Sequence, residues 1–162
     1  MAEAPGLLAW LAATPLSETM RTATWAYPVV EIVHIAAFSV LVGSVVLFDL
    51  RVLGWGRTLP VAALAQHLLR WALASALLVA AAGLLLFSAH PLELADNPVF
   101  LLKLGLIALA GLNALVFHLL PYRTVAHWER ERAAPLAARL GAVLSILLWL
   151  GVITCGRLLA YV

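Results

Sequence analysis

Three histidines lie inside long apolar runs, where an ionisable side chain is energetically unfavourable. His34, His67 and His118 each stand in a different run. A charged Arg, Lys or Asp at the centre of a membrane helix costs about 2.5–3.5 kcal/mol on insertion, so ionisable residues there indicate function by default. The neutral imidazole is a common metal ligand and holds iron in many haem proteins. These residue types therefore predict metal ligation inside a membrane.

His67 and His118 fall at similar depths if their helices are antiparallel neighbours. His67 comes about seven residues after the start of its run, and His118 about two residues before the end of its own. Imidazoles at one depth on facing helices can bind a haem from its two faces, and Arg70, one turn from His67, can pair with a propionate. In the alternative interpretation, each imidazole bonds to a carbonyl near the headgroups.

His34 lies toward the opposite side of the membrane, at the level of Lys103 and Arg157. A second haem at this level would use His34 as a ligand, with Lys103 and Arg157 beside its propionates. The sequence offers no clear partner ligand, because His90 falls at a helix end. An outer haem with one histidine, a ligand from another subunit, or no outer haem all stay open.

Glu31 precedes His34 by one helical turn, which matches half of the di-iron signature of helix bundles. The second Glu-x-x-His that such a centre needs is absent from the chain. A salt bridge from Glu31 to Lys103 or Arg157 is the simpler expectation, because it would neutralise charges within the membrane.

The composition is that of a membrane protein. Of 162 residues, 65% are hydrophobic and 11% are charged, and the mean hydropathy is +1.05. Soluble domains contain about 45–50% apolar residues, so a soluble domain is excluded. One cysteine, Cys155, excludes a disulfide framework or a cysteine-ligated cluster built by one chain. The net charge of +2 is not gathered into a basic stripe, and no nucleic-acid partner is expected.

Four apolar stretches exceed the roughly 20 helical residues that cross the hydrocarbon core. They cover about residues 28–50, 60–89, 99–120 and 135–161. We predict one all-α domain over 25–162, an integral membrane four-helix bundle, preceded over 1–24 by short interfacial helices. Asp49 and Arg51 are predicted to end the first span, so no carboxylate except Glu31 is expected within the membrane. Asn113, at mid-membrane, is expected to join helices.

The orientation follows from the basic residues, because cytoplasmic loops carry an excess of Lys and Arg. Only Arg21, Lys103 and Arg157 fall on one side of the predicted spans. Seven arginines fall on the other side: Arg51, Arg57, Arg70, Arg123, Arg130, Arg132 and Arg139. The seven-arginine side is predicted to be cytoplasmic, which places both termini in the periplasm of a bacterial cell.

Several segments resemble a bacterial family of small four-span membrane proteins of unassigned function. They are Glu31-Ile-Val-His34, GSVVLFDLR from Gly43 to Arg51, PVFLLK from Pro98 to Lys103, NALVFH from Asn113 to His118, and Gly156-Arg157 followed by Ala160-Tyr161. The likeness covers nearly the whole chain from Trp25 onward. In architecture the chain also resembles the four-helix b-type cytochromes that pass electrons between quinol and periplasmic partners. That resemblance implies an electron carrier of the bacterial inner membrane. Several of those cytochromes carry histidines on the fourth helix, and here that span has none, so we expect one haem b rather than two.

The leading prediction is a b-type haem membrane subunit that relays electrons between the quinone pool and a partner redox protein. Such a chain would serve as the membrane subunit of an oxidoreductase, with lipid and other membrane or periplasmic redox subunits as partners. Its predicted cofactor-binding residues are His67, His118, His34, Arg70, Lys103 and Arg157, with the three histidines as iron ligands. Two other classes stay open. One is a cofactor-free structural or assembly subunit, and the other is a small permease or metal-handling protein with a pathway through Glu31, His34 and Lys103.

Overall fold

The computed structural model describes residues 6–128 and 133–161, and four of its helices are long and apolar enough to cross a membrane. These are α3 (Ala26–Leu53), α4 (Val61–Ala89), α6 (Pro98–Leu119) and α7 (Leu136–Leu158). Each contains an 18-residue window with a mean hydropathy of 2.1 to 2.2. The predicted all-α, four-span architecture is therefore confirmed. Arg130 and Arg132, on which the orientation argument partly depends, lie outside the described residues.

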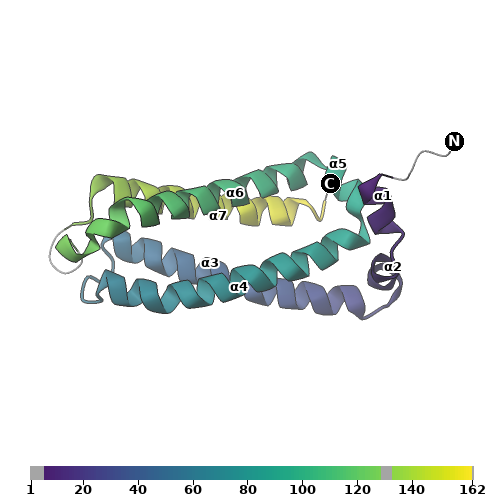
Figure 1. Ribbon diagram of the computed structural model, residues 1–162, viewed down its shortest axis with the longest axis horizontal. Coiled ribbons are helices and arrows are strands. Elements are labelled where there is room, and N and C mark those ends of the chain that lie inside the picture. The colour runs from purple at the N-terminus through teal and green to yellow at the C-terminus, as the bar shows by residue number, and fades with distance from the viewer. Residues whose placement is uncertain (1–5, 129–132, 162) are drawn as a thin grey trace.

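The four spans pack as a chain of neighbours in the order α4, α3, α7, α6. Close backbone contacts join α3 to α4, α3 to α7, and α6 to α7, whereas the backbones of α4 and α6 stay apart. Figure 1 shows the α6–α7 pair above the α3–α4 pair, with both ends of the described chain toward the same end of the bundle. α4 and α6 meet through side chains where α4 ends and α6 begins: the rings of Phe87 and Phe100 stack with their centroids 5.6 Å apart.

Small side chains allow the helices to approach one another. In one buried cluster, Val52 of α3 and Phe117 of α6 pack against Ala138 and Ala142 of α7. Lipid tails are as apolar as the helices, so association in a membrane depends on close packing rather than on the hydrophobic effect. The alanines of α7 permit this packing where α3 and α6 reach the same end of the bundle.

The first span is longer than predicted, because Asp49 and Arg51 do not end it. Helix α3 continues to Leu53 and stops at Gly54, whose φ of +110° is the left-handed conformation that favours glycine at a helix C-terminus. Arg51 is buried within the helix and donates hydrogen bonds to the carbonyl oxygens of Leu59, at 2.6 Å, and of Arg57, at 3.3 Å. The loop after α3 therefore satisfies the arginine without ending the helix.

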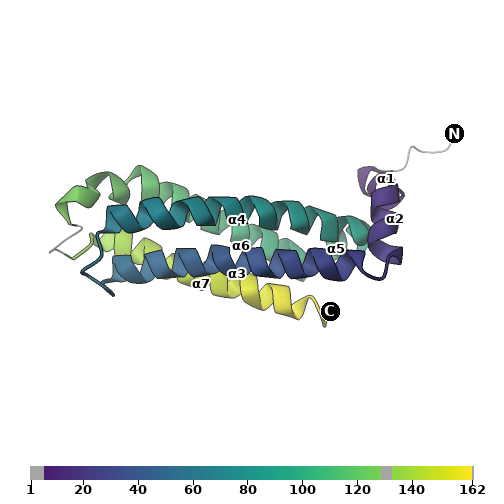
Figure 2. The ribbon, with the colours of Figure 1, turned by 90° about the horizontal axis from the view of Figure 1, so that it is seen from below.

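Short helices cover the opposite end of the bundle, as Figure 2 shows. They are α1 (Leu7–Ala12), α2 (Pro15–Thr22) and α5 (Pro91–Asp96), and a 3-10 helix, η1 (Pro121–His127), follows α6 at the other end. Thr14 caps α2, as its hydroxyl accepts a hydrogen bond from the Ser17 amide at 3.3 Å. Residues 7–22 thus form the short helices that the sequence predicted before the first span.

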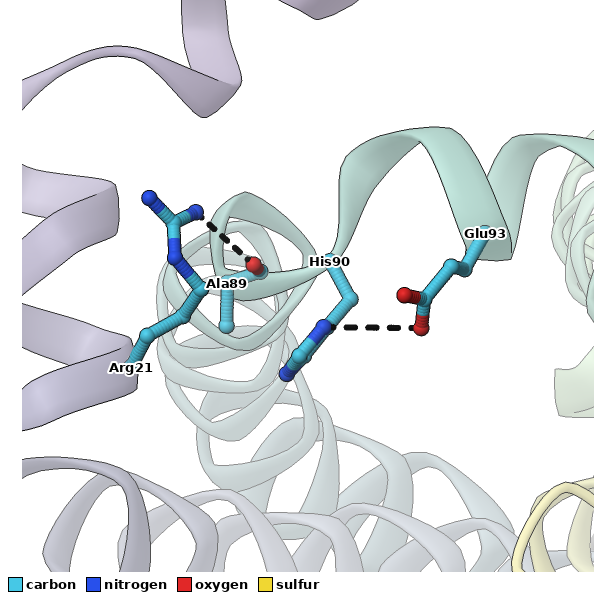
Figure 3. A network of polar contacts seen from close by, with 4 residues as sticks. All are labelled: Arg21, Ala89, His90 and Glu93. Atoms are coloured by element: carbon cyan, nitrogen blue, oxygen red, sulfur yellow. Dashed lines mark hydrogen bonds and ion pairs between the residues drawn. The ribbon is translucent and has the colours of Figure 1, made fainter.

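Arg21 ties α2 to the end of α4. Its guanidinium donates to the carbonyl oxygen of Ala89 at 3.1 Å (Figure 3) and to that of Ala12 at 2.9 Å. Carbonyls at a helix C-terminus lack partners within the helix, so a cation placed there is favourable. One side chain therefore fastens the N-terminal helices to the bundle.

We expect Arg21→Ala to loosen residues 7–22 without unfolding the spans. Hydrogen bonds from charged groups contribute about 1.5–3 kcal/mol when buried, and this partly exposed pair should contribute roughly 1 kcal/mol. Amide hydrogen exchange in α1 and α2 should accelerate several-fold while exchange in α3 is unchanged. Arg21→Lys keeps the charge but has no guanidinium to bond both carbonyls at once, so its exchange rates should fall between those of the wild type and of Arg21→Ala. Unchanged exchange in both variants would contradict the anchoring role.

Candidate functional site

A cavity of about 110 Å³ lies in the membrane-spanning part of the bundle, near the end where α3 stops and α4 begins. Its walls come from all four spans and are mostly apolar. Five polar side chains line it: Ser44, Asp49, Asn113, His118 and Ser145. The backbones of α4 and α6 stay apart beside the cavity, so no close helix–helix contact closes it between these two helices. We call this space the Asp49 cavity.

Asp49 is the acidic residue in the wall of this cavity. Its side chain lies within α3 and is 7% exposed. The Ser145 hydroxyl donates a hydrogen bond to the carboxyl group, and the Oδ2 atom has no hydrogen-bond partner. The described residues that line the cavity include no lysine or arginine. Burying a carboxyl group without a full set of partners costs free energy, so its presence here calls for a function.

Asn113 joins two spans at the cavity. Its Nδ2 donates to the carbonyl oxygen of Gly141 at 3.0 Å, which links α6 to α7. A Cβ on Gly141 would lie 3.6 Å from the Asn113 Oδ1, an ordinary van der Waals distance, so the Asn113 amide packs directly on this part of α7. The predicted role of Asn113 in joining helices is confirmed.

His118 lines the cavity from α6 with one ring nitrogen already engaged. Its Nδ1 lies 2.8 Å from the carbonyl oxygen of Ala114, one turn earlier. A carbonyl can only accept, so Nδ1 carries the proton and Nε2 keeps its lone pair. The ring also packs against Phe117 and Tyr122. Nε2 is thus available as a base or as a metal ligand.

The structure does not bring His67 and Arg70 to the same place as His118. Both side chains are exposed, and neither lines the Asp49 cavity. Ala65 and Leu68 of α4 face the cavity, and a helix turns about 100° per residue, so His67 points to roughly the opposite side of α4. The backbones of α4 and α6 also stay apart, which separates the predicted pair further.

His34 packs between α3 and α4. Its imidazole donates to the carbonyl of Val79, and its Nδ1 is buried with no hydrogen-bond partner. A Cβ on Gly83 would stand 3.2 Å from the His34 Cε1, so the ring lies directly on the α4 backbone. The ring is stacked on Phe38. His34 is therefore held against a helix and does not line the Asp49 cavity.

Of the other outer residues, Lys103 lies within electrostatic range of His34, whereas Arg157 and His90 make their contacts elsewhere. Lys103 is half-buried, with its Nζ 3.8 Å from the point where a Cβ on Gly156 would stand, so it lies against α7. Arg157 donates to the Tyr161 hydroxyl and lies over that ring, 5.0 Å from its centroid. His90 contacts Glu93 at 3.4 Å in the outer connection (Figure 3).

The predicted salt bridge of Glu31 is wrong for the described residues. Glu31 is exposed, and no ion pair joins it to Lys103 or Arg157 within the part of the chain that the structure describes. The two basic side chains point elsewhere: Lys103 packs against α7, and Arg157 bonds to Tyr161, four residues later in the chain. No group of three or more His, Cys, Asp or Glu that could hold a metal ion occurs among residues 6–128 and 133–161.

Sequence reasoning missed the centre of the cavity. Asp49 was predicted to end the first span, and neither Ser44 nor Ser145 was among the predicted cofactor-binding residues. One signal was present: apolar residues continue after Asp49 at Leu50, Val52 and Leu53, and a glycine follows them. That pattern places a helix stop at Gly54 and leaves Asp49 inside the span.

The fold and the site together define a four-span membrane protein with a mostly apolar cavity whose wall carries a few polar side chains. The chain belongs to DUF6644, a family of unknown function, whose model matches residues 9–162. This match confirms the resemblance to a four-span family of unassigned function. No curated protein and no solved structure matches the chain.

We expect Asn113→Leu to weaken the α6–α7 association. Hydrogen bonds between membrane helices contribute about 0.6 kcal/mol on average and up to about 1.7, and the unfolding free energy should fall within that range. Reversible unfolding in bicelles measures it. Thr154→Val is the matched control, because the Thr154 hydroxyl bonds to Leu150 within its own helix and joins no neighbour. An Asn113→Leu variant as stable as this control would show that the bond does not stabilise the bundle.

Proposed function

We propose that this protein is a membrane subunit that binds a lipid-soluble quinone in the Asp49 cavity and exchanges electrons between the quinone pool and a partner redox protein. The observation that carries the proposal is the cavity: a mostly apolar space within the spans, which no close helix–helix contact closes between α4 and α6, with a few polar groups in its wall. Ligand sites have this composition, in which apolar walls bind and a few polar groups orient.

The chemistry of a quinone matches these walls. Its ring is flat and apolar, and its two oxygens accept hydrogen bonds as carbonyls and donate them as quinol hydroxyls. Leu68 and Leu69 of α4 and Phe48 of α3 supply apolar surface for the ring. The Nε2 of His118 and the free Oδ2 of Asp49 supply polar contacts for its oxygens. A ligand that enters from the bilayer also needs no path through water.

The same proposal includes the location of the chain. The excess of arginines on one side supports an inner-membrane protein of a bacterium with periplasmic termini. Asp49 lies near the end of α3 that Arg51 and Arg57 follow, so the cavity would open in the cytoplasmic half of the bilayer. Electrons from the quinol would pass to a one-electron carrier in this chain or in its partner.

We expect Ala114→Phe to weaken quinone binding at least about tenfold, because Ala114 lines the cavity and a phenyl ring would occupy it. The measurement is a titration of the full chain in lipid nanodiscs with short-chain ubiquinone and menaquinone. Ala108→Phe, also on α6 but not in the cavity wall, should bind as the wild type does. No saturable binding by the wild type, or equal binding by both variants, would refute the proposal.

A single haem b ligated by His118 is a second candidate for the same protein, and one observation favours it. The bond from the His118 Nδ1 to the Ala114 carbonyl leaves Nε2 available, and a bond of this kind is what orients metal-binding histidines. A haem held by His67 and His118 together does not fit the arrangement, because His67 does not line the cavity. When bound, haem would supply one-electron transfer.

The haem candidate predicts b-type Soret and alpha bands in the reduced-minus-oxidised absorbance of the purified protein. His118→Ala should abolish these bands, and His67→Ala should leave them in place. A wild-type spectrum without such bands would exclude haem while leaving the quinone proposal to its own titration. Loss of the bands in His67→Ala but not in His118→Ala would reverse the assignment of the ligand.

A further inference from the structure

We infer that Asp49 is a catalytic residue that exchanges a proton with one oxygen of the bound quinone, and that Ser145 is the positioning residue that holds its carboxyl group. This inference rests on the proposed function, and it adds the group through which the proton passes. It is argued from the burial of Asp49, its open oxygen atom and its single hydrogen-bond donor.

The carboxyl group is only partly satisfied by the protein. Ser145 donates to it across the α3–α7 interface, and Oδ2 has no hydrogen-bond partner although the side chain is more than nine-tenths buried. A buried polar group without a partner costs about 1–3 kcal/mol, and more when it is charged. A ligand hydroxyl bonded to Oδ2 would remove this cost. Asp49 is thus prepared for a ligand that carries a hydrogen-bonding oxygen.

The proton step balances with two groups in the wall. When a quinol is oxidised, each of its two O–H bonds breaks, and its two electrons pass one at a time to a one-electron carrier of the haem class. One proton goes to the Asp49 carboxylate and the other to the Nε2 of His118, whose other nitrogen is held by Ala114. In quinone reduction the same two groups return the protons as the electrons arrive.

A structural role is the alternative, because the hydrogen bond from Ser145 links α3 to α7. Asp49→Asn separates the two roles. An asparagine oxygen still accepts the bond from Ser145, whereas an amide neither takes up nor releases a proton in this range. A variant that folds and binds quinone but does not exchange the proton isolates the chemistry from the packing.

The experiment is redox-induced infrared difference spectroscopy on the full chain in nanodiscs with short-chain quinone. The wild type should show a change in the carbonyl stretch of a carboxylic acid on reduction, and Asp49→Asn should lose it while binding quinone within about threefold of the wild type. Ser145→Ala should shift this band without abolishing it. Glu31→Gln is the matched control, an exposed acid of the same helix, and should keep the band.

Isotope labelling gives the same answer without altering Asp49. The chain has two aspartates, Asp49 and Asp96, so carboxyl-labelled aspartate in an Asp96→Asn background reports on Asp49 alone. A shift of the band on labelling supports the inference. Quinone binding with no aspartate band, or a band that persists in Asp49→Asn, overturns the role of Asp49 and leaves the proposed function standing. Failure of the wild type to bind quinone overturns both.

Discussion

Helix association without a hydrophobic driving force is the constraint on which this structure depends. Within lipid, two helices stay together only where small residues or interhelical hydrogen bonds let them pack better against each other than against acyl chains. Ala138 and Ala142 on α7 and Gly83 on α4 provide such places. Close contacts of this kind join α3 to α4, α3 to α7 and α6 to α7, whereas α4 and α6 meet only where Phe87 stacks on Phe100 among the described ring contacts. The cavity lies where the backbones of α4 and α6 stay apart.

The polar residues within the spans divide according to how their hydrogen bonds are satisfied. Asn113 bonds to a neighbouring backbone, His34 bonds to Val79, and Arg51 bonds to the loop after its own helix. These contacts make the side chains part of the packing. The Nδ1 of His34 also lacks a partner, but it is packed between α3 and α4 and lines no described cavity. Asp49 and His118 each keep one atom without a protein partner, and both line the same cavity. In a low-dielectric interior such open atoms are costly, and they mark where chemistry with a ligand would take place.

The arrangement of the histidines bears on what kind of redox site this bundle can hold. A bis-histidine haem needs two imidazoles directed into one space, and His67 points away from the cavity that His118 lines. A histidine and a carboxyl group in a cavity wall can exchange protons with a bound ligand, and the proposed quinone site is built on these two groups. His118 therefore belongs to this cavity and not to a ligand pair with His67.

The number of spans, the short helices before them and the role of Asn113 could all be predicted from the sequence. Those features depend on local properties, namely apolar length, capping residues such as Thr14, and the cost of an amide in lipid. The sequence also indicates the end of α3 at Gly54, because apolar residues continue after Asp49. The prediction missed this helix end because Asp49 and Arg51 were expected to end the span.

Which helices are neighbours, and therefore which polar residues meet, could not be predicted from the sequence and is seen in the folded bundle. Depth along a helix can be counted from the sequence, but the direction of a side chain relative to another helix cannot, because it depends on packing order and on the rotation of each span. His67 and His118 share a depth without sharing a cavity, whereas Asp49 and Ser145, far apart in the chain, share a hydrogen bond. The physical reason is that close packing at small residues selects the neighbours of each helix.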